Sequence, residues 1–107
     1  MKPLRILIEA RWLLLDPLKW EKSAAGYGDP NAEKFCMMGA CLKVSGALAF
    51  HGADPLDRAN MHKTRGFLKE VLNHKPITQF NDNPNTTHKM LIAKFDEAIA
   101  LAQRESI

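Results

Sequence analysis

A short polar segment, residues 80–87, contains the side chains best suited to bind a small polar ligand. Asn81 supplies a hydrogen-bond donor and an acceptor, and Asp82 supplies a carboxylate. A helical apolar pattern follows the segment, and the first N–H groups of a helix have no partner inside it. Asn81 and Asp82, together with Trp20, are therefore the candidate ligand-binding residues. The structural alternative, which the frequency of Asx turns and caps favours, is that the two Asx side chains bond the backbone of their own turn.

A second group of residues could bind a partner through its charge. Four basic side chains follow one another at spacings of four, three and four: Arg58, His62, Arg65 and Lys69. This spacing places them on one helical face, which fits an acidic protein surface or a phosphate-bearing small ligand. The alternative, favoured because most charged helix faces are only solvated, is a face without a partner. A net charge of only +3, no recognisable reading motif and no interleaved aromatic residues argue against nucleic acid.

The two cysteines raise the question of catalysis. Cys36 lies near a predicted helix start, where a thiolate is favoured, and a histidine could serve as its base. Asp82 with a histidine is the other hydrolase alternative. The apolar neighbours of Cys36 instead favour a core position, and we predict that the protein is not an enzyme. Cys41 lies five residues further along the same predicted helix, on a different face, so the pair is unsuited to a disulfide and indicates a reducing cytoplasm.

The histidines do not form a metal-binding pattern. They fall in separate segments of the chain, at His51, His62, His74 and His88. No Cys-x-x-Cys or His-Glu-x-x-His spacing is present. A composite site of His51, His62 and Asp57 is an alternative, but the spacing favours no metal site, and we predict no cofactor.

The length and composition of the chain define its class. Its 107 residues, 46% hydrophobic and 25% charged, fit one globular domain over residues 1–107. No apolar run approaches the roughly 20 residues that cross a bilayer, so we expect no membrane span. The N-terminus begins like a signal peptide. Glu9 and Arg11 interrupt its apolar stretch and no small-residue cleavage site follows, so we expect this segment to belong to the mature fold.

Apolar residues recur at helical spacing along nearly the whole chain, which predicts an all-α fold, a compact bundle of about four helices. The first helix is expected to begin at Pro3, because a missing N–H is harmless in the first turn. It should end at Asp16, because the residue before a proline avoids the α region. Its expected apolar stripe consists of Leu4, Leu7, Ile8, Leu14 and Leu15.

The second predicted helix, residues 31–51, is expected to be the central one. It is apolar on nearly every face between Phe35 and Phe50, and a helix of that kind is surrounded by others. Its expected N-terminal signal is the Asp29-Pro30 pair, a cap followed by a first-turn proline. Its expected end is the His51-Gly52 pair, in which Gly52 adopts the left-handed conformation.

Two further helices complete the predicted bundle. The pair Asp54-Pro55 repeats the cap and the first-turn proline, so the third helix should begin there. Residues 77–80 alternate in polarity and predict at most a brief extended segment, because no second strand signal exists to pair with them. The last helix carries Leu91 and Phe95 on its apolar face.

Several short motifs occur in a particular order along the chain. They are Trp20, the run Phe35-Cys36-Met37-Met38-Gly39-Ala40, the segment Phe80-Asn81-Asp82-Asn83-Pro84 with Thr87, and the closing residues 95–102. Together they resemble a small domain family of unknown function found in bacteriophages and actinobacteria. The resemblance covers roughly residues 4–104. Two departures are Met90, where the capping box after Thr87 would place a glutamate, and Phe80, where the family often has tryptophan. The resemblance implies a phage or prophage accessory protein and transfers no mechanism.

These observations predict a non-enzymatic binding protein that acts on a host protein or a small ligand. A small hydrolase using Cys36 or Asp82 is one alternative. A self-associating helical module is the other, with exposed apolar side chains such as Trp12, Ile6 and Leu13 forming a homodimer contact.

Overall fold

The structure is a computed structural model that describes residues 1–23, 31–46 and 54–105. Its elements in chain order are α1 (Pro3–Leu14), the short 3₁₀ helix η1 (Pro17–Lys19), α2 (Met37–Ser45), α3 (Pro55–Val71), α4 (Ile77–Asp82) and α5 (His88–Arg104). Within these described parts, every regular element is helical, and the β contact they contain is an isolated parallel bridge between Trp20 and Phe35. The all-α prediction is confirmed, with five α-helices in the described residues where about four were expected.

The predicted helix starts are confirmed where they rest on local capping. Pro3 opens α1. Asp54 caps α3 by accepting hydrogen bonds from the N–H groups of Leu56 at 2.9 Å and Asp57 at 3.0 Å, followed by Pro55 at the first helical position. Thr87 caps α5 by accepting a hydrogen bond from the Met90 N–H at 3.2 Å.

The prediction that residues 31–51 form one helix is wrong at its beginning. The Phe35 N–H donates to the carbonyl of Lys19, and the Phe35 carbonyl accepts from the Glu21 N–H, so this part of the chain is bridged to the segment after η1. Cys36 then takes the N-cap position, where its Sγ accepts a hydrogen bond from the Gly39 N–H at 3.3 Å. The expected signal at Asp29-Pro30 lies outside the described residues.

The same prediction is also wrong at the end of the helix. α2 stops at Ser45 because Gly46 adopts the left-handed conformation, with φ of 80°, which a residue without a Cβ does at little cost. The expected cap at His51-Gly52 lies outside the described residues.

Residues 77–82 form the short helix α4 and no extended segment. Ile77 and Asn81, four residues apart, both face the interior. Asn81 and Asp82 therefore lie in the last turn of a helix, whereas the sequence suggested a turn before α5. Tertiary packing of α4 against α2 overrides the weak alternating pattern.

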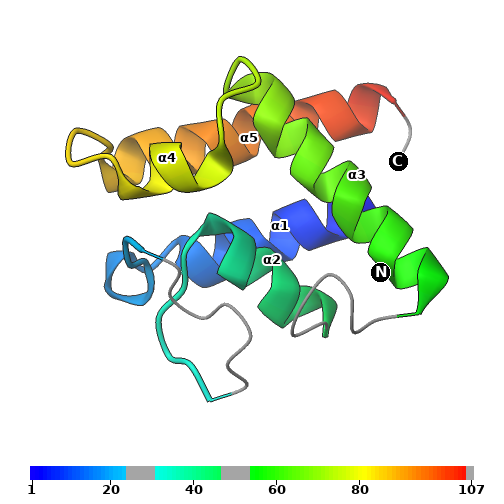
Figure 1. Ribbon diagram of the computed structural model, residues 1–107, viewed down its shortest axis with the longest axis horizontal. Coiled ribbons are helices and arrows are strands. Elements are labelled where there is room, and N and C mark those ends of the chain that lie inside the picture. The colour runs from blue at the N-terminus through cyan, green and yellow to red at the C-terminus, as the bar shows by residue number, and fades with distance from the viewer. Residues whose placement is uncertain (24–30, 47–53, 106–107) are drawn as a thin grey trace.

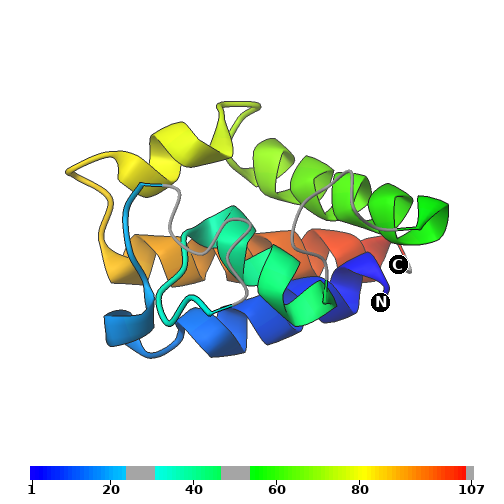
Figure 2. The ribbon, with the colours of Figure 1, turned by 60° about the horizontal axis from the view of Figure 1, so that its bottom comes forward.

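The helices pack around α1, which contacts α2, α3 and α5. Figures 1 and 2 show α1 and α5 lying side by side and running in opposite directions, with α3 crossing both near one end of the molecule. α1 and α2 therefore share the central position that was expected of α2 alone. The first six residues of α2, 37–42, are all buried. The largest fully buried side chains of the core are Phe95, Ile6, Leu7, Leu14, Met37, Leu42, Met61, Leu68 and Leu91.

No helix in residues 1–23, 31–46 or 54–105 is both long enough and apolar enough to cross a membrane.

Candidate functional site

The Asn81 side chain is buried at 1% exposure and makes four hydrogen bonds inside the protein. Its Oδ1 accepts from Trp20 Nε1 at 2.9 Å and from the Met37 N–H at 3.1 Å. Its Nδ2 donates to the Glu21 carbonyl at 3.2 Å and to Asp82 Oδ1 at 2.9 Å. A primary amide has two donors and two acceptor lone pairs, so Asn81 has no capacity left for a ligand.

Two side chains contact the ring of Trp20. Lys22 Nζ lies 5.0 Å from the ring centroid, within cation–π distance, and the His88 ring lies at 6.1 Å with a tilt of 49°. His88 Nε2 is 2.7 Å from the Leu14 carbonyl oxygen, which can only accept, so this nitrogen carries the proton. His88 therefore joins the start of α5 to the end of α1, and its ring also contacts Trp20.

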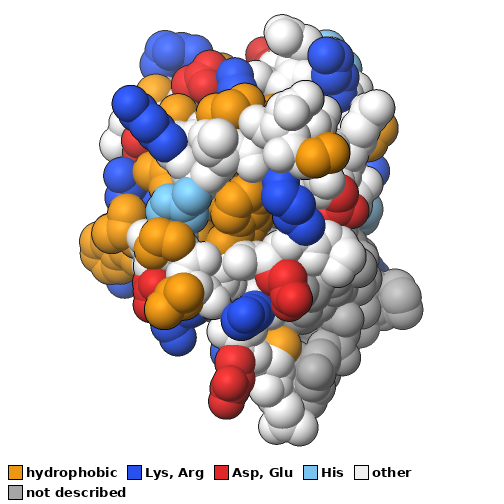
Figure 3. All heavy atoms as spheres, turned by 90° about the vertical axis from the view of Figure 1, so that its left-hand side faces the viewer, with side chains coloured by type: hydrophobic (Ala, Val, Ile, Leu, Met, Phe, Trp, Pro, Cys, Tyr) orange, Lys and Arg blue, Asp and Glu red, His pale blue; other side chains and the backbone are white. Residues whose placement is uncertain are grey.

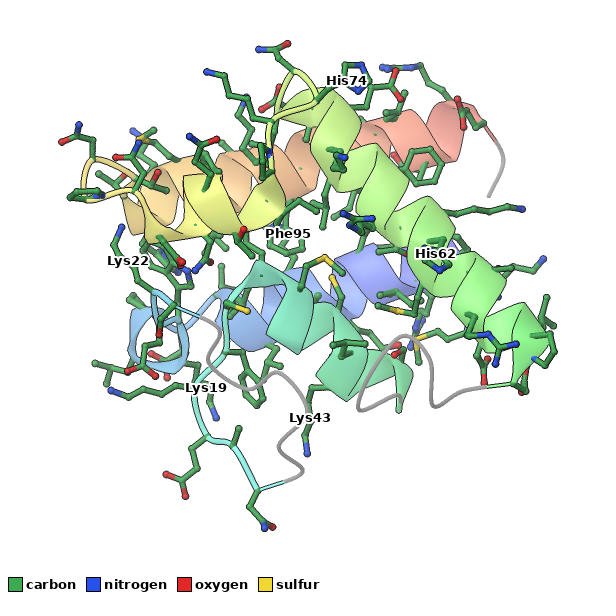
Figure 4. The ribbon with its side chains drawn as sticks, viewed as in Figure 1. Lys19, Lys22, Lys43, His62, His74 and Phe95 are labelled. Atoms are coloured by element: carbon green, nitrogen blue, oxygen red, sulfur yellow. The ribbon has the colours of Figure 1, made fainter. Side chains whose placement is uncertain are left out.

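Lys22 closes the loop that leads into α5. Its Nζ donates to the carbonyl of Asn83 at 2.5 Å and to that of Thr86 at 3.0 Å, and Figure 4 shows it reaching from the chain after η1 toward that loop. Asp82 Oδ1 accepts from the Ser23 N–H at 2.6 Å as well as from Asn81. We call Trp20, Lys22, Asn81 and Asp82 the Trp20–Asn81 junction. Its geometry favours the structural alternative for the predicted ligand residues.

A hollow of about 310 Å³ lies beside the junction, between the end of α3, α4 and α5. Lys75, Asn73, Gln79, Phe80 and Asn83 are among its lining residues. Its second lysine, Lys94, donates to the Val71 carbonyl at 3.3 Å and pairs with Glu97 at 3.0 Å, so this ammonium group already caps the end of α3.

Both cysteines have the environment of core residues. They are buried, and both are free thiols. Burial raises the pKa of the Cys36 thiol above its ordinary value of 9.0, against the opposing effect of the Gly39 N–H. Burial, with the neighbouring Cys36, raises the pKa of the Cys41 thiol to about 12. A protonated, enclosed thiol is a poor nucleophile, so this geometry does not favour the Cys36 hydrolase alternative.

Within the described residues, no group of three or more His, Cys, Asp or Glu side chains is placed to hold a metal ion. His62 and His74 are exposed on and after α3, whereas His88 contacts Trp20 and Leu14. His51, a member of the alternative composite site, lies outside the described residues.

The basic face predicted on α3 lies on one helix, as its spacing required. Arg65 and His62 are exposed, and Arg58 and Lys69 are half-buried. Figure 4 shows His62 on α3, across the molecule from Lys22. The basic face and the Trp20–Asn81 junction therefore lie apart in the structure. The role of the basic face in partner binding stays a prediction.

A group of exposed apolar side chains lies at the end of the molecule where α1 stops and α5 starts. The exposed fractions are 61% for Trp12, 50% for Leu15, 78% for Leu18 and 43% for Met90. Trp12 lies in the last turn of α1, Leu15 is the residue directly after α1, and Leu18 follows in η1. The contact of His88 with the Leu14 carbonyl brings the start of α5 next to the end of α1. Figure 3 shows hydrophobic side chains gathered on this end. We call these four residues the apolar end patch.

The prediction of exposed apolar residues on α1 is correct for Trp12 and wrong for Ile6. Ile6 is 1% exposed because it packs in the core, and Leu13 is half-buried against that core. The sequence also predicts that Leu18 and Trp20 fold back as an apolar plug after the Asp16-Pro17 break. This prediction is wrong for Leu18, which is 78% exposed, whereas Trp20 is half-buried. No local signal in the sequence indicates that Lys22 and His88 meet Trp20.

Comparison with known proteins gives one match. The sequence model of a family of unknown function, DUF6197, matches residues 1–101. No curated protein and no solved structure matches the chain.

Proposed function

We propose that this chain, which belongs to the DUF6197 family, is a non-enzymatic binding protein that docks an acidic protein partner on the apolar end patch. The observation that carries the proposal is the exposure of Trp12, Leu15, Leu18 and Met90 on one end of the molecule. Contiguous exposed apolar side chains mark interaction sites, and tryptophan is enriched among the residues that dominate binding energy.

The charges around the patch support an acidic partner. Lys19 follows Leu18 directly, Lys89 precedes Met90, and both lysines are exposed. The acidic side chains nearby are engaged, because Asp96 pairs with Arg11 at 2.7 Å and Asp16 accepts from the Leu18 N–H at 2.9 Å. A basic rim around an apolar centre complements an acidic surface. In a symmetric pair of copies the same lysines would face one another, so charge disfavours a second copy as the occupant.

The proposed setting is the cytoplasm of a bacterial host, with the protein acting as a phage or prophage accessory protein on a host protein. The order of motifs from Trp20 to the closing residues 95–102 supports this setting. Two buried free thiols, Cys36 and Cys41, fit a reducing compartment.

The test compares the parent protein with a Trp12→Ala/Leu18→Ser variant. Each is used to capture proteins from a bacterial lysate, and a captured protein counts only when it binds the parent in calorimetry after purification. We expect the variant to lose about tenfold or more in affinity, because truncating a central tryptophan costs on the order of 2 kcal/mol. Leu56→Ser is the matched control, since Leu56 is 69% exposed at the start of α3.

Two results would overturn the proposal. One is equal affinity of the parent, the Trp12→Ala/Leu18→Ser variant and the Leu56→Ser control for the purified partner. The other is a concentration-dependent dimer in light scattering that Trp12→Ala abolishes, because the patch would then belong to a second copy of the chain. We expect a monomer at all concentrations.

A further inference from the structure

A second hollow, of about 470 Å³, lies next to Leu18, between the end of α1, η1, the segment before α2, and α2 itself. Its apolar lining comes from Leu13, Leu18, Ala32 and Phe35. Its charged lining consists of Lys19, Lys34, Lys43, Asp16 and Glu33. Leu18 thus belongs both to this basic hollow and to the apolar end patch. Figure 4 shows Lys19 and Lys43 on the same edge of the molecule, coming from η1 and α2.

The backbone brings two of these lysines together. In the parallel bridge, Trp20 pairs with Phe35 through the hydrogen bonds from the Phe35 N–H to the Lys19 carbonyl at 2.8 Å and from the Glu21 N–H to the Phe35 carbonyl at 3.0 Å. Lys19 and Lys34 directly precede the two bridged residues, so they stand beside each other on the adjacent segments. Like charges in such a position repel, and an anionic partner relieves that repulsion.

The acidic residues of the hollow do not cancel this charge. Three lysines face two carboxylates, and Asp16 already accepts the Leu18 N–H as the cap of η1. Lys19, Lys34 and Lys43 are all exposed, so each ammonium group can move toward a ligand on its flexible stem.

We infer that this basic hollow binds an acidic, amphipathic segment of the protein partner. An apolar side chain of that segment packs on Leu18 and Phe35, and flanking carboxylates pair with Lys19, Lys34 and Lys43. The inference rests on the proposed function and specifies the partner's chemistry. The apolar lining favours a peptide over a free phosphate, which offers nothing to pack on it. It favours a peptide over nucleic acid because the exposed apolar residue of the hollow, Leu18, has no ring for base stacking, and the ring of Phe35 is only 3% exposed.

The test uses two short fluorescent peptides, each with a central Leu-Phe pair. One peptide has glutamates around the pair and the other has lysines at the same positions. We expect the protein to bind the acidic peptide and not the basic one in fluorescence anisotropy, and the affinity to fall with added salt. A Lys19→Gln/Lys34→Gln/Lys43→Gln variant should bind the acidic peptide about tenfold or more weakly, as loss of interfacial charge pairs does.

The matched control is Lys2→Gln/Lys63→Gln/Lys75→Gln, which removes the same net charge from exposed lysines elsewhere. Circular dichroism of both variants should match the parent. Equal binding of the two peptides, or equal losses in the two lysine variants, would overturn the inference. Tighter binding of an oligonucleotide that depends on Lys19, Lys34 and Lys43 would overturn it as well, by assigning the hollow to nucleic acid.

The two proposals fail in different ways. Suppose that the Trp12→Ala/Leu18→Ser variant fails to bind the purified partner while the Lys19→Gln/Lys34→Gln/Lys43→Gln variant binds it normally. In that case the apolar end patch is the docking site and the assignment of the hollow is wrong. If the partner binds both variants like the parent, both proposals are wrong.

Discussion

The indole N–H of Trp20 donates a hydrogen bond of 2.9 Å to the amide oxygen of Asn81, across 61 positions of sequence. The same oxygen accepts the Met37 N–H at the start of α2, and the amide nitrogen reaches the Glu21 carbonyl. One asparagine therefore ties the chain after η1, the beginning of α2 and the end of α4 to one point. The predicted ligand residues hold the fold together at the place where these three segments meet.

Replacing Asn81 with alanine should destabilise the protein by about 2–3 kcal/mol. The change leaves the Trp20 and Met37 N–H groups without their acceptor in a buried place, and an unsatisfied buried donor costs about 1–3 kcal/mol. Chemical denaturation measures the difference. Gln79→Ala is the control, an exposed residue of the same helix, and it should change stability by no more than about 0.5 kcal/mol. Equal stabilities of the two variants would show that the junction contributes nothing.

Two glycines should respond to alanine with opposite signs. Gly46 has φ of 80°, which alanine adopts only with strain, and no atom lies within 4 Å of an added Cβ, so Gly46→Ala should destabilise by about 1 kcal/mol through the backbone alone. Gly66 lies inside α3 with equally open space around its Cβ position. Gly66→Ala should stabilise by up to about 1 kcal/mol. The pair is measured by thermal unfolding, and a shift of the same sign in both would contradict the left-handed cap of α2.

The two thiols should be nearly inert in the folded protein. Cys36 and Cys41 are buried and their pKa values are raised, so alkylation by iodoacetamide near neutral pH should be far slower than in guanidinium chloride. Mass spectrometry at timed intervals gives both rates. Rapid alkylation of Cys36 in the native state would instead support a role for Cys36 as a nucleophile.

Stability should fall at alkaline pH in a manner that depends on Cys41. The thiol ionises near 9.0 when unfolded, whereas burial raises its pKa to about 12 in the fold. Its contribution is therefore fully present below pH 9 and is lost as the pH rises toward 12, with a slope of up to about 1.4 kcal/mol per pH unit. Cys41→Ala should be less stable at neutral pH but show a shallower alkaline decline in denaturation curves. Identical slopes in the two proteins would contradict the burial of this thiol.

The basic face of α3 is tested by charge reversal at an exposed position. Arg65→Glu should leave folding unchanged, because an exposed charge contributes little to stability. If this face meets the acidic partner, the change should slow association and weaken its salt dependence, because charges at a rim steer the encounter. Stopped-flow mixing with the purified partner measures both effects. Unaltered affinity and salt dependence in a triple glutamate variant of Arg58, Arg65 and Lys69 would show that this face is solvated and does not bind the partner.

The sequence alone determined the helix starts at Pro3, Asp54 and Thr87. A capping side chain and a first-turn proline act within one turn of the chain, so their effect is readable without the rest of the fold. The basic spacing on α3 is local in the same way. The start of α2 was not readable, because Cys36 takes the cap position next to Phe35, which is bridged to the segment that follows η1.

Only the tertiary structure decided which apolar residues of α1 are buried and what Asn81 does. α1 is apolar on more than one face, so docking against α2 and α5 determined that Ile6 and Leu14 enter the core while Trp12 and Leu15 stay outside. The partners of Asn81 come from segments about 44 and 61 positions away, and no local pattern encodes such distances. The hydrogen-bonding and apolar groups that each side chain offers were therefore predictable from the sequence. Which of them are buried or bonded inside the protein depended on which segments the folded chain brought together.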